Sequence, residues 1–160
     1  MSKYIKTLSL NDPQKNIWLK TFASYKTLNN ELGNRKGSLS LVPTMGSLHQ
    51  GHLSLIKKAV KKSPNVIVSI FVNPTQFENK SDLTTYPENL KNDLSKLQDL
   101  KNILVYIPNT EDLYPKKIVA NKYNFGKTDK IMEGKDRANH FNGVATIVEK
   151  LFKIFKPDFA

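Results

Sequence analysis

The chain has 160 residues, no cysteine and a formal net charge of +11. This length suits one domain, residues 1–160, with a buried core, and the lack of cysteine excludes a disulfide-bonded scaffold. No apolar run is long enough to span a membrane and Met1 to Asn11 has no apolar signal core, so we expect no membrane partner and a cytoplasmic location.

The positive charge is concentrated in the first half of the chain. Residues 1–80 hold 12 Lys or Arg against 3 Asp or Glu, whereas residues 81–160 hold 13 against 11. Four lysines lie at the far end of a predicted helix, where cations complement the helix dipole. They are Lys57, Lys58, Lys61 and Lys62. We interpret them as a solvated face, and the alternative is a field that attracts a polyanionic substrate.

The first elements are a loop, a helix and a strand. Thr7–Asn16 is polar and contains Asn, Asp and Pro, which predicts a loop. An imperfect apolar stripe predicts a helix from about Pro13 to Leu32, ended by Gly33. The apolar run Ser38–Val42 predicts the first strand. Because proline lacks the N–H that a sheet ladder needs, we expect the strand to stop there and Pro43–Gly46 to form a turn.

After the turn, apolar spacing predicts a helix that runs to about Lys62. The β-branched run Val66–Val72 then predicts a central strand that is buried on both faces. Asn73 and Pro74 end this strand. Asn73 and Gln76 are therefore expected at the same carboxyl edge of the sheet as the preceding turn.

The second half of the chain continues the alternation of helices and strands. We predict a helix at about Pro87–Leu100, a strand at Ile103–Ile107, a short turn at Glu111–Tyr114, irregular structure over residues 116–139 and a helix at Asn142–Phe155. This β-α-β-α-β order predicts an α/β fold with a doubly wound parallel sheet.

The turn leads into H-x-G-H, His49 to His52, at a junction of strand and helix. In a parallel α/β sheet such a junction usually binds ligands, and the free N–H groups of a helix N-terminus attract phosphate. The two imidazoles lie on one face, and Gly51 removes a Cβ that would keep a base or a phosphate off the backbone. The alternatives are ordinary polar residues of a first helical turn, or a shared metal without an evident third ligand.

Five segments carry a resemblance to a known family. They are P-T-M-G-S-L-H-Q-G-H at Pro43–His52, S-I-F-V-N-P-T-Q-F at Ser69–Phe77, Tyr86-Pro87, M-E-G at Met132–Gly134, and the run from His140 to Asp158. Together they resemble the pantothenate synthetases, within the HIGH-type adenylate-forming nucleotidyl transferases. The resemblance covers about Ser38–Ala160.

The resemblance implies a Rossmann-like fold and an ATP-dependent ligation, with ATP and Mg²⁺ as cofactors. In that reaction the pantoate carboxylate attacks the α-phosphate of ATP, pyrophosphate leaves, and the amine of β-alanine attacks the pantoyl adenylate. The resemblance also implies a homodimer. Because the family continues with a further strand and a smaller domain, we expect this chain to be the N-terminal ATP- and pantoate-binding portion, with little or no activity alone.

The resemblance assigns an ATP cradle to eight consecutive residues: Met45, Gly46, Ser47, Leu48, His49, Gln50, Gly51 and His52. Within it His52 matches the proposed general acid, and both histidines supply donors for the oxygens of the transition state. Two cationic imidazoles this close would repel each other, so at most one is charged at neutral pH.

A second set of residues is assigned to the other substrates. Gln76 matches the glutamine that binds pantoate and β-alanine, because a carboxamide both donates and accepts hydrogen bonds. Asn73 and Val144 are further predicted contacts. The alternatives are a surface loop for Gln76, a loop cap for Asn73 and plain core for Val144.

The chain departs from the family pattern at two places. Ala138-Asn139 stands where the family often has Pro-Gly, which affects the turn beside Arg137 and His140. The helix after Tyr86-Pro87 often carries paired acids, proposed as Mg²⁺ ligands, but here Asn92 precedes Asp93, so one carboxylate of the pair remains. Asp93 is therefore a candidate metal contact, with a solvated charge as the alternative.

Two other functions remain open. Another HIGH-type nucleotidyl transferase would share the ATP cradle, but this alternative does not explain the segment V-N-P-T-Q-F. A basic RNA-binding fragment would need aromatic side chains interleaved with lysine on an exposed face. Most Phe and Leu residues are predicted to be buried, so we expect no nucleic-acid partner.

Overall fold

The computed structural model describes residues 19–126 and 140–160. Within this part the chain forms two compact units. The sheet unit comprises residues 19–71, 88–109 and 157–160, and the second unit comprises residues 72–87, 110–126 and 140–156. Whether the two units form the single domain expected from the sequence depends on how they are arranged, so that expectation stays a prediction.

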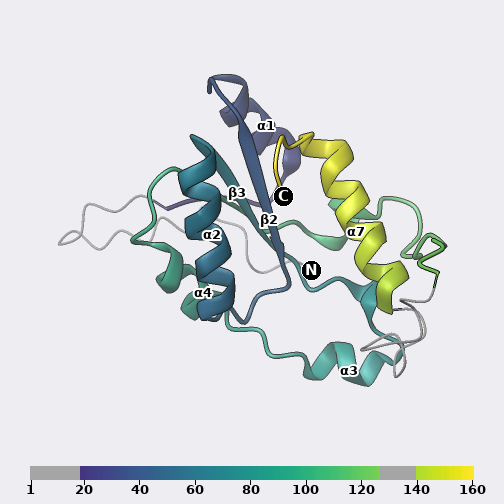
Figure 1. Ribbon diagram of the computed structural model, residues 1–160. Coiled ribbons are helices and arrows are strands. Elements are labelled where there is room, and N and C mark those ends of the chain that lie inside the picture. The colour runs from purple at the N-terminus through teal and green to yellow at the C-terminus, as the bar shows by residue number, and fades with distance from the viewer. Residues whose placement is uncertain (1–18, 127–139) are drawn as a thin grey trace. The chain divides into compact units, whose positions relative to one another are not determined.

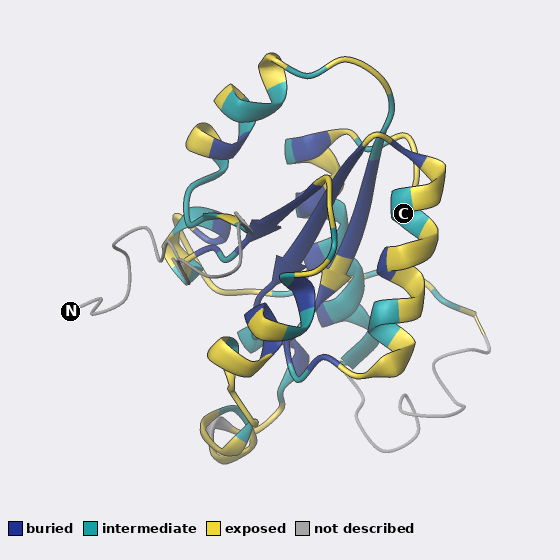
Figure 2. Cartoon of the chain, turned by 90° about the vertical axis from the view of Figure 1, so that its left-hand side faces the viewer, coloured by how far each residue is buried: buried dark blue, intermediate teal, exposed yellow. Residues whose placement is uncertain are grey.

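The sheet unit contains four parallel strands in the order β1-β4-β3-β2 (Figure 1). They are β1 (Lys20–Phe22), β2 (Leu39–Thr44), β3 (Asn65–Ile70) and β4 (Ile103–Tyr106). All residues of β3 and β4 are buried, as Figure 2 shows. The predicted α/β class with a parallel sheet is confirmed, and so is the central position of the β-branched run.

Two helices cover one face of this sheet and enclose the core of the unit with it. They are α2 (Gln50–Lys62) and α4 (Leu90–Leu97), which lie on the same side of β2 and β3 in Figure 1. The buried core contains apolar side chains from the sheet, the β2–α2 turn and both helices: Val42, Leu48, Ile56, Val66, Val68, Ile70, Leu94, Leu97, Ile103 and Val105. Burial of this cluster supplies the main driving force that holds the unit together.

Pro43 lies inside β2, so the prediction that the strand stops there is wrong. The Leu41 N–H donates to the Phe159 carbonyl oxygen at 2.9 Å, which places the main-chain groups of odd-numbered β2 residues on the outer edge. Pro43 is one of these residues. Its missing N–H would have faced the outer edge, so no ladder bond to β3 is lost.

The predicted helix from Pro13 to Leu32 is wrong over the described residues before Ser24. Lys20–Phe22 forms β1 beside β4, and α1 spans only Tyr25–Gly33. Ser24 is the N-cap of this helix, and its Oγ accepts the Lys26 N–H at 3.2 Å. A strand of three residues is too short to show a period of its own, and pairing with β4 stabilises it.

The second unit contains η1 (Pro74–Gln76), α3 (Lys80–Thr85), α5 (Thr110–Leu113) and α7 (His140–Phe155). Helix α7 confirms the predicted final helix, and α5 lies where a short turn was predicted. Helix α3 was not predicted from the sequence. The predicted helix at Pro87–Leu100 is longer than α4 (Leu90–Leu97), which starts after Asn89 because the Asn89 Oδ1 accepts the Asn92 N–H at 3.1 Å and caps the helix.

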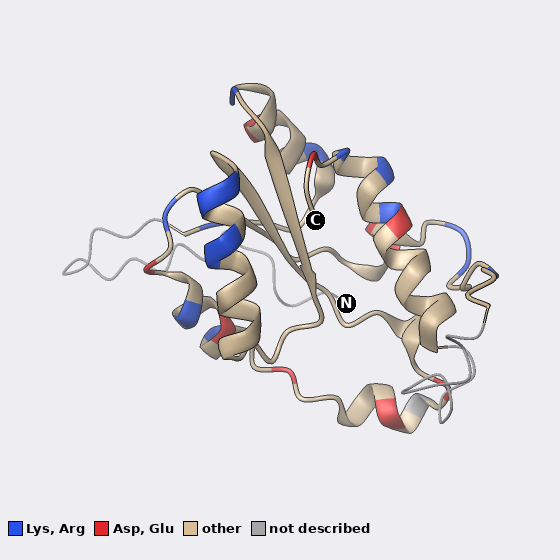
Figure 3. Ribbon diagram, in the orientation of Figure 1, with Lys and Arg blue, Asp and Glu red and all other residues tan. Residues whose placement is uncertain are grey.

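Several predictions lie outside the described residues. They concern the loop Thr7–Asn16, Met132–Gly134, Arg137, Ala138 and Asn139. Over the part of the chain that is described, no helix is long and apolar enough to cross a membrane. The lysines at the end of α2 are exposed, as predicted for a solvated face (Figure 3).

The corrected start of α1 can be tested by removing its cap. Ser24→Ala should lower the free energy of unfolding by about 1 kcal/mol, because the Lys26 N–H loses its acceptor. Ser54→Ala, in the exposed interior of α2, is the matched control and should leave stability unchanged or slightly higher. Equal losses in urea unfolding would show that the helix does not begin at Ser24.

Candidate functional site

The two histidines of H-x-G-H form a capping box at the start of α2. His49 is the N-cap, and its Nδ1 accepts the Gly51 N–H at 3.1 Å. The His52 Nδ1 accepts the His49 N–H at 3.3 Å, and the two ring centroids lie 4.1 Å apart. Because both Nδ1 atoms are acceptors, a neutral ring carries its proton on Nε2. Each imidazole therefore keeps an Nε2–H group to donate to a ligand.

The charge state of His52 follows from its surroundings. Burial lowers the pKa of His52 below its usual 6.5, and the neighbouring His49 lowers it further, whereas Asp93 acts in the opposite direction. The positive end of the helix dipole also disfavours a cation at this position. His52 is therefore a neutral donor at pH 7, consistent with the expectation that at most one ring is charged.

Gly51 has a structural role in addition to the predicted one. A Cβ at this position would lie 2.9 Å from Cε1 and 3.1 Å from Nδ1 of His49. The glycine therefore makes room for the capping imidazole, which needs to lie against the Gly51 N–H. A close approach of substrate to the backbone is not needed to explain it.

Several backbone N–H groups at this junction already have acceptors, which narrows the set of free N–H groups expected there. The Gly46 N–H donates to Thr44 Oγ1 at 3.3 Å. The N–H groups of Ser47 and Leu48 donate to Asp93 Oδ2 and Oδ1 at 2.9 and 2.7 Å. With those of His49 and Gly51 engaged by the two rings, the side-chain donors that the junction keeps are the two imidazole Nε2–H groups.

Asp93 is not the solvated charge that was considered as an alternative. Its side chain is only 1% exposed, and each carboxylate oxygen accepts a backbone N–H. Among the described residues, no group of three or more His, Cys, Asp or Glu could hold a metal ion. Because both oxygens of this buried carboxylate already accept N–H groups, Asp93 does not fit the role of a Mg²⁺ ligand.

The second set of predicted residues meets at Asn73, in the second unit. Asn73 is fully buried. Its Nδ2 donates to the Gly143 carbonyl and to Gln76 Oε1, both at 3.0 Å. Its Oδ1 accepts from the Tyr114 hydroxyl at 2.8 Å and from the backbone and hydroxyl of Thr75. The carboxamide of Asn73 is thus fully used inside the protein.

This network fixes how Gln76 is oriented. The Gly143 carbonyl can only accept and the Thr75 N–H can only donate, which determines the Asn73 amide and therefore makes the Gln76 oxygen the acceptor. No partner for the Gln76 amide nitrogen occurs among the described residues. Gln76 is 8% exposed, so it is not a surface-loop residue, and it keeps an NH₂ group to donate.

Gly143 and Tyr114 were not predicted from the sequence as site residues. A Cβ on Gly143 would lie 2.3 Å from the Thr75 carbonyl oxygen and 2.8 Å from the Gln76 Cα, so glycine lets α7 contact η1 directly. A glycine inside an apolar helical stripe was the signal for this contact. Val144, next to it, is half-buried. The predicted contact of Val144 with pantoate stays a prediction. The placement of Gln76 beside the histidine pair also stays a prediction, because it concerns how the two units are arranged.

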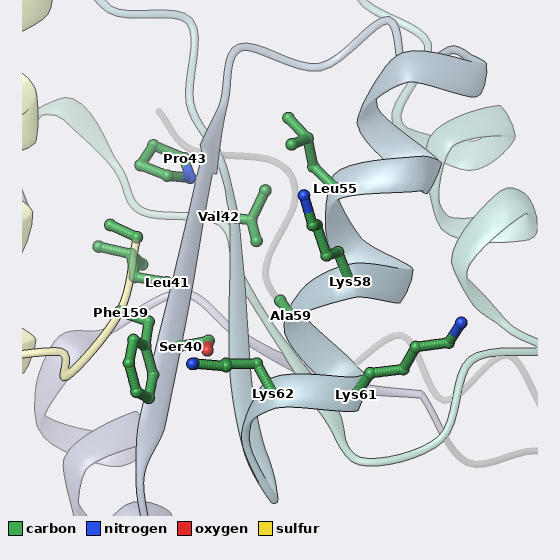
Figure 4. A pocket seen from close by; sticks show the side chains of 11 residues that line it. Ser40, Leu41, Val42, Pro43, Leu55, Lys58, Ala59, Lys61, Lys62 and Phe159 are labelled. Atoms are coloured by element: carbon green, nitrogen blue, oxygen red, sulfur yellow. The ribbon is translucent and has the colours of Figure 1, made fainter.

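A cavity of about 570 Å³ lies between the outer edge of β2 and α2. Figure 4 shows its apolar wall, formed by Leu41, Pro43, Leu55, Ala59 and Phe159, with lysines at its rim. One of these, Lys62, places its Nζ 4.5 Å from the centre of the Phe159 ring. The lining contains none of the predicted site residues, so the cavity does not mark the candidate site.

The chain matches a family of known enzymes over most of its length. The family model described as Pantoate-beta-alanine ligase matches residues 18–160. A pantothenate synthetase of Christiangramia forsetii is 51% identical over 124 residues, which cover 77% of this chain and 44% of the relative. A pantoate–β-alanine ligase of Schizosaccharomyces pombe is 46% identical over 129 residues, covering 80% and 44%. The chain thus spans about half the length of the relatives that it matches.

Solved structures agree with this similarity. A pantoate–β-alanine ligase from Francisella tularensis, complexed with beta-gamma ATP and β-alanine, superposes with a TM-score of 0.80 at 39% identity, covering 88% of this chain and 54% of that chain. A pantothenate synthetase from Thermus thermophilus superposes with a TM-score of 0.77 at 36% identity, covering 87% and 50%.

The contact between α7 and η1 can be tested with a pair of helical glycines. Gly143→Ala should lower the free energy of unfolding by about 1–3 kcal/mol, because the added methyl overlaps the Thr75 carbonyl. Gly33→Ala, where nothing lies within 4 Å of the new Cβ, should be neutral or stabilising. Similar urea midpoints for the two variants would contradict the proposed contact.

The lowered pKa of His52 predicts a pH dependence of stability. A folded-state pKa below the unfolded value means that the unfolded chain binds the proton more readily. The contribution of His52 is therefore complete above the unfolded pKa and is lost as pH falls through about 6.5 toward the lower folded pKa.

The measurement is thermal unfolding between pH 7 and 5, combined with an NMR titration of His52. The NMR midpoint should lie below 6.5. His52→Gln keeps an acceptor for the His49 N–H but does not titrate. The stability of this variant should therefore decrease less than that of the unmutated protein as pH is lowered from 7 to 5. A titration midpoint above 6.5, or an equal pH dependence in the variant, would contradict the assignment.

Proposed function

Because the chain belongs to the pantoate–β-alanine ligase family, we propose that it supplies the ATP- and pantoate-binding part of an enzyme that joins pantoate to β-alanine. The complex of the Francisella tularensis relative with beta-gamma ATP and β-alanine supports ATP and β-alanine as ligands. Mg²⁺, a homodimer and a cytoplasmic location remain expectations of the family resemblance.

The observation that carries the proposal is the pair of Nε2–H donors at the start of α2. During adenylation an oxygen of the pantoate carboxylate bonds to the α-phosphorus, and the bond from that phosphorus to the pyrophosphate oxygen breaks. Negative charge then spreads over the phosphoryl oxygens, and fixed donors stabilise it. Since both rings accept backbone N–H groups through Nδ1, their remaining donors are held in place before substrate binds.

The state of His52 determines how it acts. With a lowered pKa the ring is neutral at pH 7, so it stabilises charge by hydrogen bonding. Proton transfer, the role of general acid implied by the resemblance, would require the cation that burial disfavours. We therefore assign to His52 the role of a neutral hydrogen-bond donor to the phosphoryl group.

Gln76 is the proposed contact with pantoate. Its amide nitrogen is the part of the side chain left to donate to a carboxylate or a hydroxyl. Asn73 has no capacity left for a substrate, so its role is to hold Gln76 in this orientation, together with Tyr114 and Gly143. In the second step the β-alanine amine attacks the acyl carbon, AMP leaves, and the amine proton passes to solvent.

The test separates the two substrates in the full-length protein. Gln76→Ala should weaken pantoate binding by about 1–3 kcal/mol and ATP binding much less, because the lost donor leaves a polar group of pantoate unpaired. His52→Ala should instead slow pantoate-dependent exchange of labelled pyrophosphate into ATP by about 10² or more.

The matched control is Gln98→Ala, at the end of α4, which should change neither quantity. An equal loss of both ligands in Gln76→Ala would count against its assignment to pantoate. Absence of any pantoate-dependent exchange in the unmutated protein would refute the proposed function itself.

A further inference from the structure

The turn between β2 and α2 has an unusual backbone conformation that requires stabilising contacts. Gly46 has a φ of 89° and Ser47 a φ of 50°, so two successive residues adopt left-handed conformations. A residue with a side chain, such as Ser47, rarely adopts this conformation without support. Successive N–H groups in such a turn form a concavity that binds an anion.

The anion in this concavity is the carboxylate of Asp93. It receives the N–H groups of Ser47 and Leu48, one on each oxygen. A Cβ on Gly46 would lie 3.1 Å from Asp93 Oδ2, so the glycine allows the carboxylate to approach closely. The concavity is therefore filled by the chain's own side chain and is closed to a substrate phosphate.

Lys96 adds a contact from the next turn of α4. Its Nζ donates to the Leu48 carbonyl oxygen at 2.5 Å. Asp93 and Lys96 thus hold the N–H and the C=O of the same buried residue. Because Leu48 directly precedes the N-cap His49, helix α4 fixes the point from which the histidine pair starts.

The geometry of the rings depends on this starting point. His49 has an extended backbone, with φ −130° and ψ −179°, from which its ring reaches back to the Gly51 N–H. A rotation at Leu48 would move the ring away from this N–H and away from His52, 4.1 Å distant. Asp93 also lies close enough to act on the charge of His52.

We propose that Asp93 and Lys96 are positioning residues for the His49–His52 pair, and that Asp93 is not the magnesium ligand that the family resemblance implies. Both oxygens of the carboxylate are engaged by the turn, and the side chain is buried. Only the catalytic consequence rests on the proposed function, because the orientation of the imidazoles can be measured without substrate.

The first test is NMR of the histidine side chains in this chain. In the unmutated chain both rings should show the Nε2–H tautomer and a ring-to-ring nuclear Overhauser effect. Asp93→Asn and Lys96→Met should weaken that effect and mix the tautomers, whereas the exposed Asp99→Asn and Lys91→Met should not. If both test variants gave the same histidine spectra as the unmutated chain, the proposal would be overturned. If Asp93→Asn does not fold, the spectra of Lys96→Met alone decide.

The second test uses Mn²⁺ alone as a paramagnetic probe of metal binding. We expect no selective broadening of the Ser47 and Leu48 amide signals, because the carboxylate beside them is occupied. Selective broadening at these amides that disappears in Asp93→Asn would show that Asp93 binds metal, and would overturn the proposal.

The third test is kinetic and uses the full-length protein. In Asp93→Asn, kcat for adenylation should fall roughly 10- to 100-fold while KM for ATP changes less than threefold, because misplaced donors act mainly on the transition state. A kcat in Asp93→Asn equal to that of the unmutated protein would contradict the positioning role of Asp93. If the unmutated protein shows no adenylation, the proposed function fails, and the NMR test still decides the positioning role.

Discussion

The junction of β2 and α2 satisfies most of its own backbone N–H groups, and the rest of the site depends on this. Asp93 takes two of them and the imidazoles of His49 and His52 take two more. A helix N-terminus usually offers its N–H groups directly to an anion. Here the histidines accept them and present Nε2–H groups in their place, so the donors to a ligand are side chains whose orientation is fixed by the fold.

The second unit uses the same arrangement with a carboxamide in place of the imidazoles. Asn73 is buried and all its hydrogen-bonding groups are used, which leaves the Gln76 nitrogen as the donor that remains. In each unit a buried side chain uses all of its hydrogen-bonding groups inside the protein and thereby fixes the orientation of a neighbouring donor. Asp93 does this for the imidazoles, and Asn73 does it for Gln76. Such preorganisation suits a reaction in which the protein stabilises charge and forms no covalent bond.

Hydrophobic pattern was sufficient to predict β3, α2 and α7, because each has a long apolar period or a continuous β-branched run. It failed for β1, whose three residues are stabilised by pairing with β4. The H-x-G-H and N-P-T-Q-F segments could be identified from the sequence, but their hydrogen-bonding partners could not. Asp93 lies more than forty residues from the turn that it holds, and no local pattern shows that a helical aspartate faces inward.

The central claim is that imidazole N–H groups, and not the backbone of the turn, contact the nucleotide. An NMR titration of the protein with ATP, observing side-chain and backbone ¹⁵N signals together, tests it most directly. We expect the largest shifts at Nε2–H of His49 and His52, with small shifts at the amides of Ser47 and Leu48 because these donate to Asp93. Large shifts at those two amides with unchanged imidazole signals would contradict it.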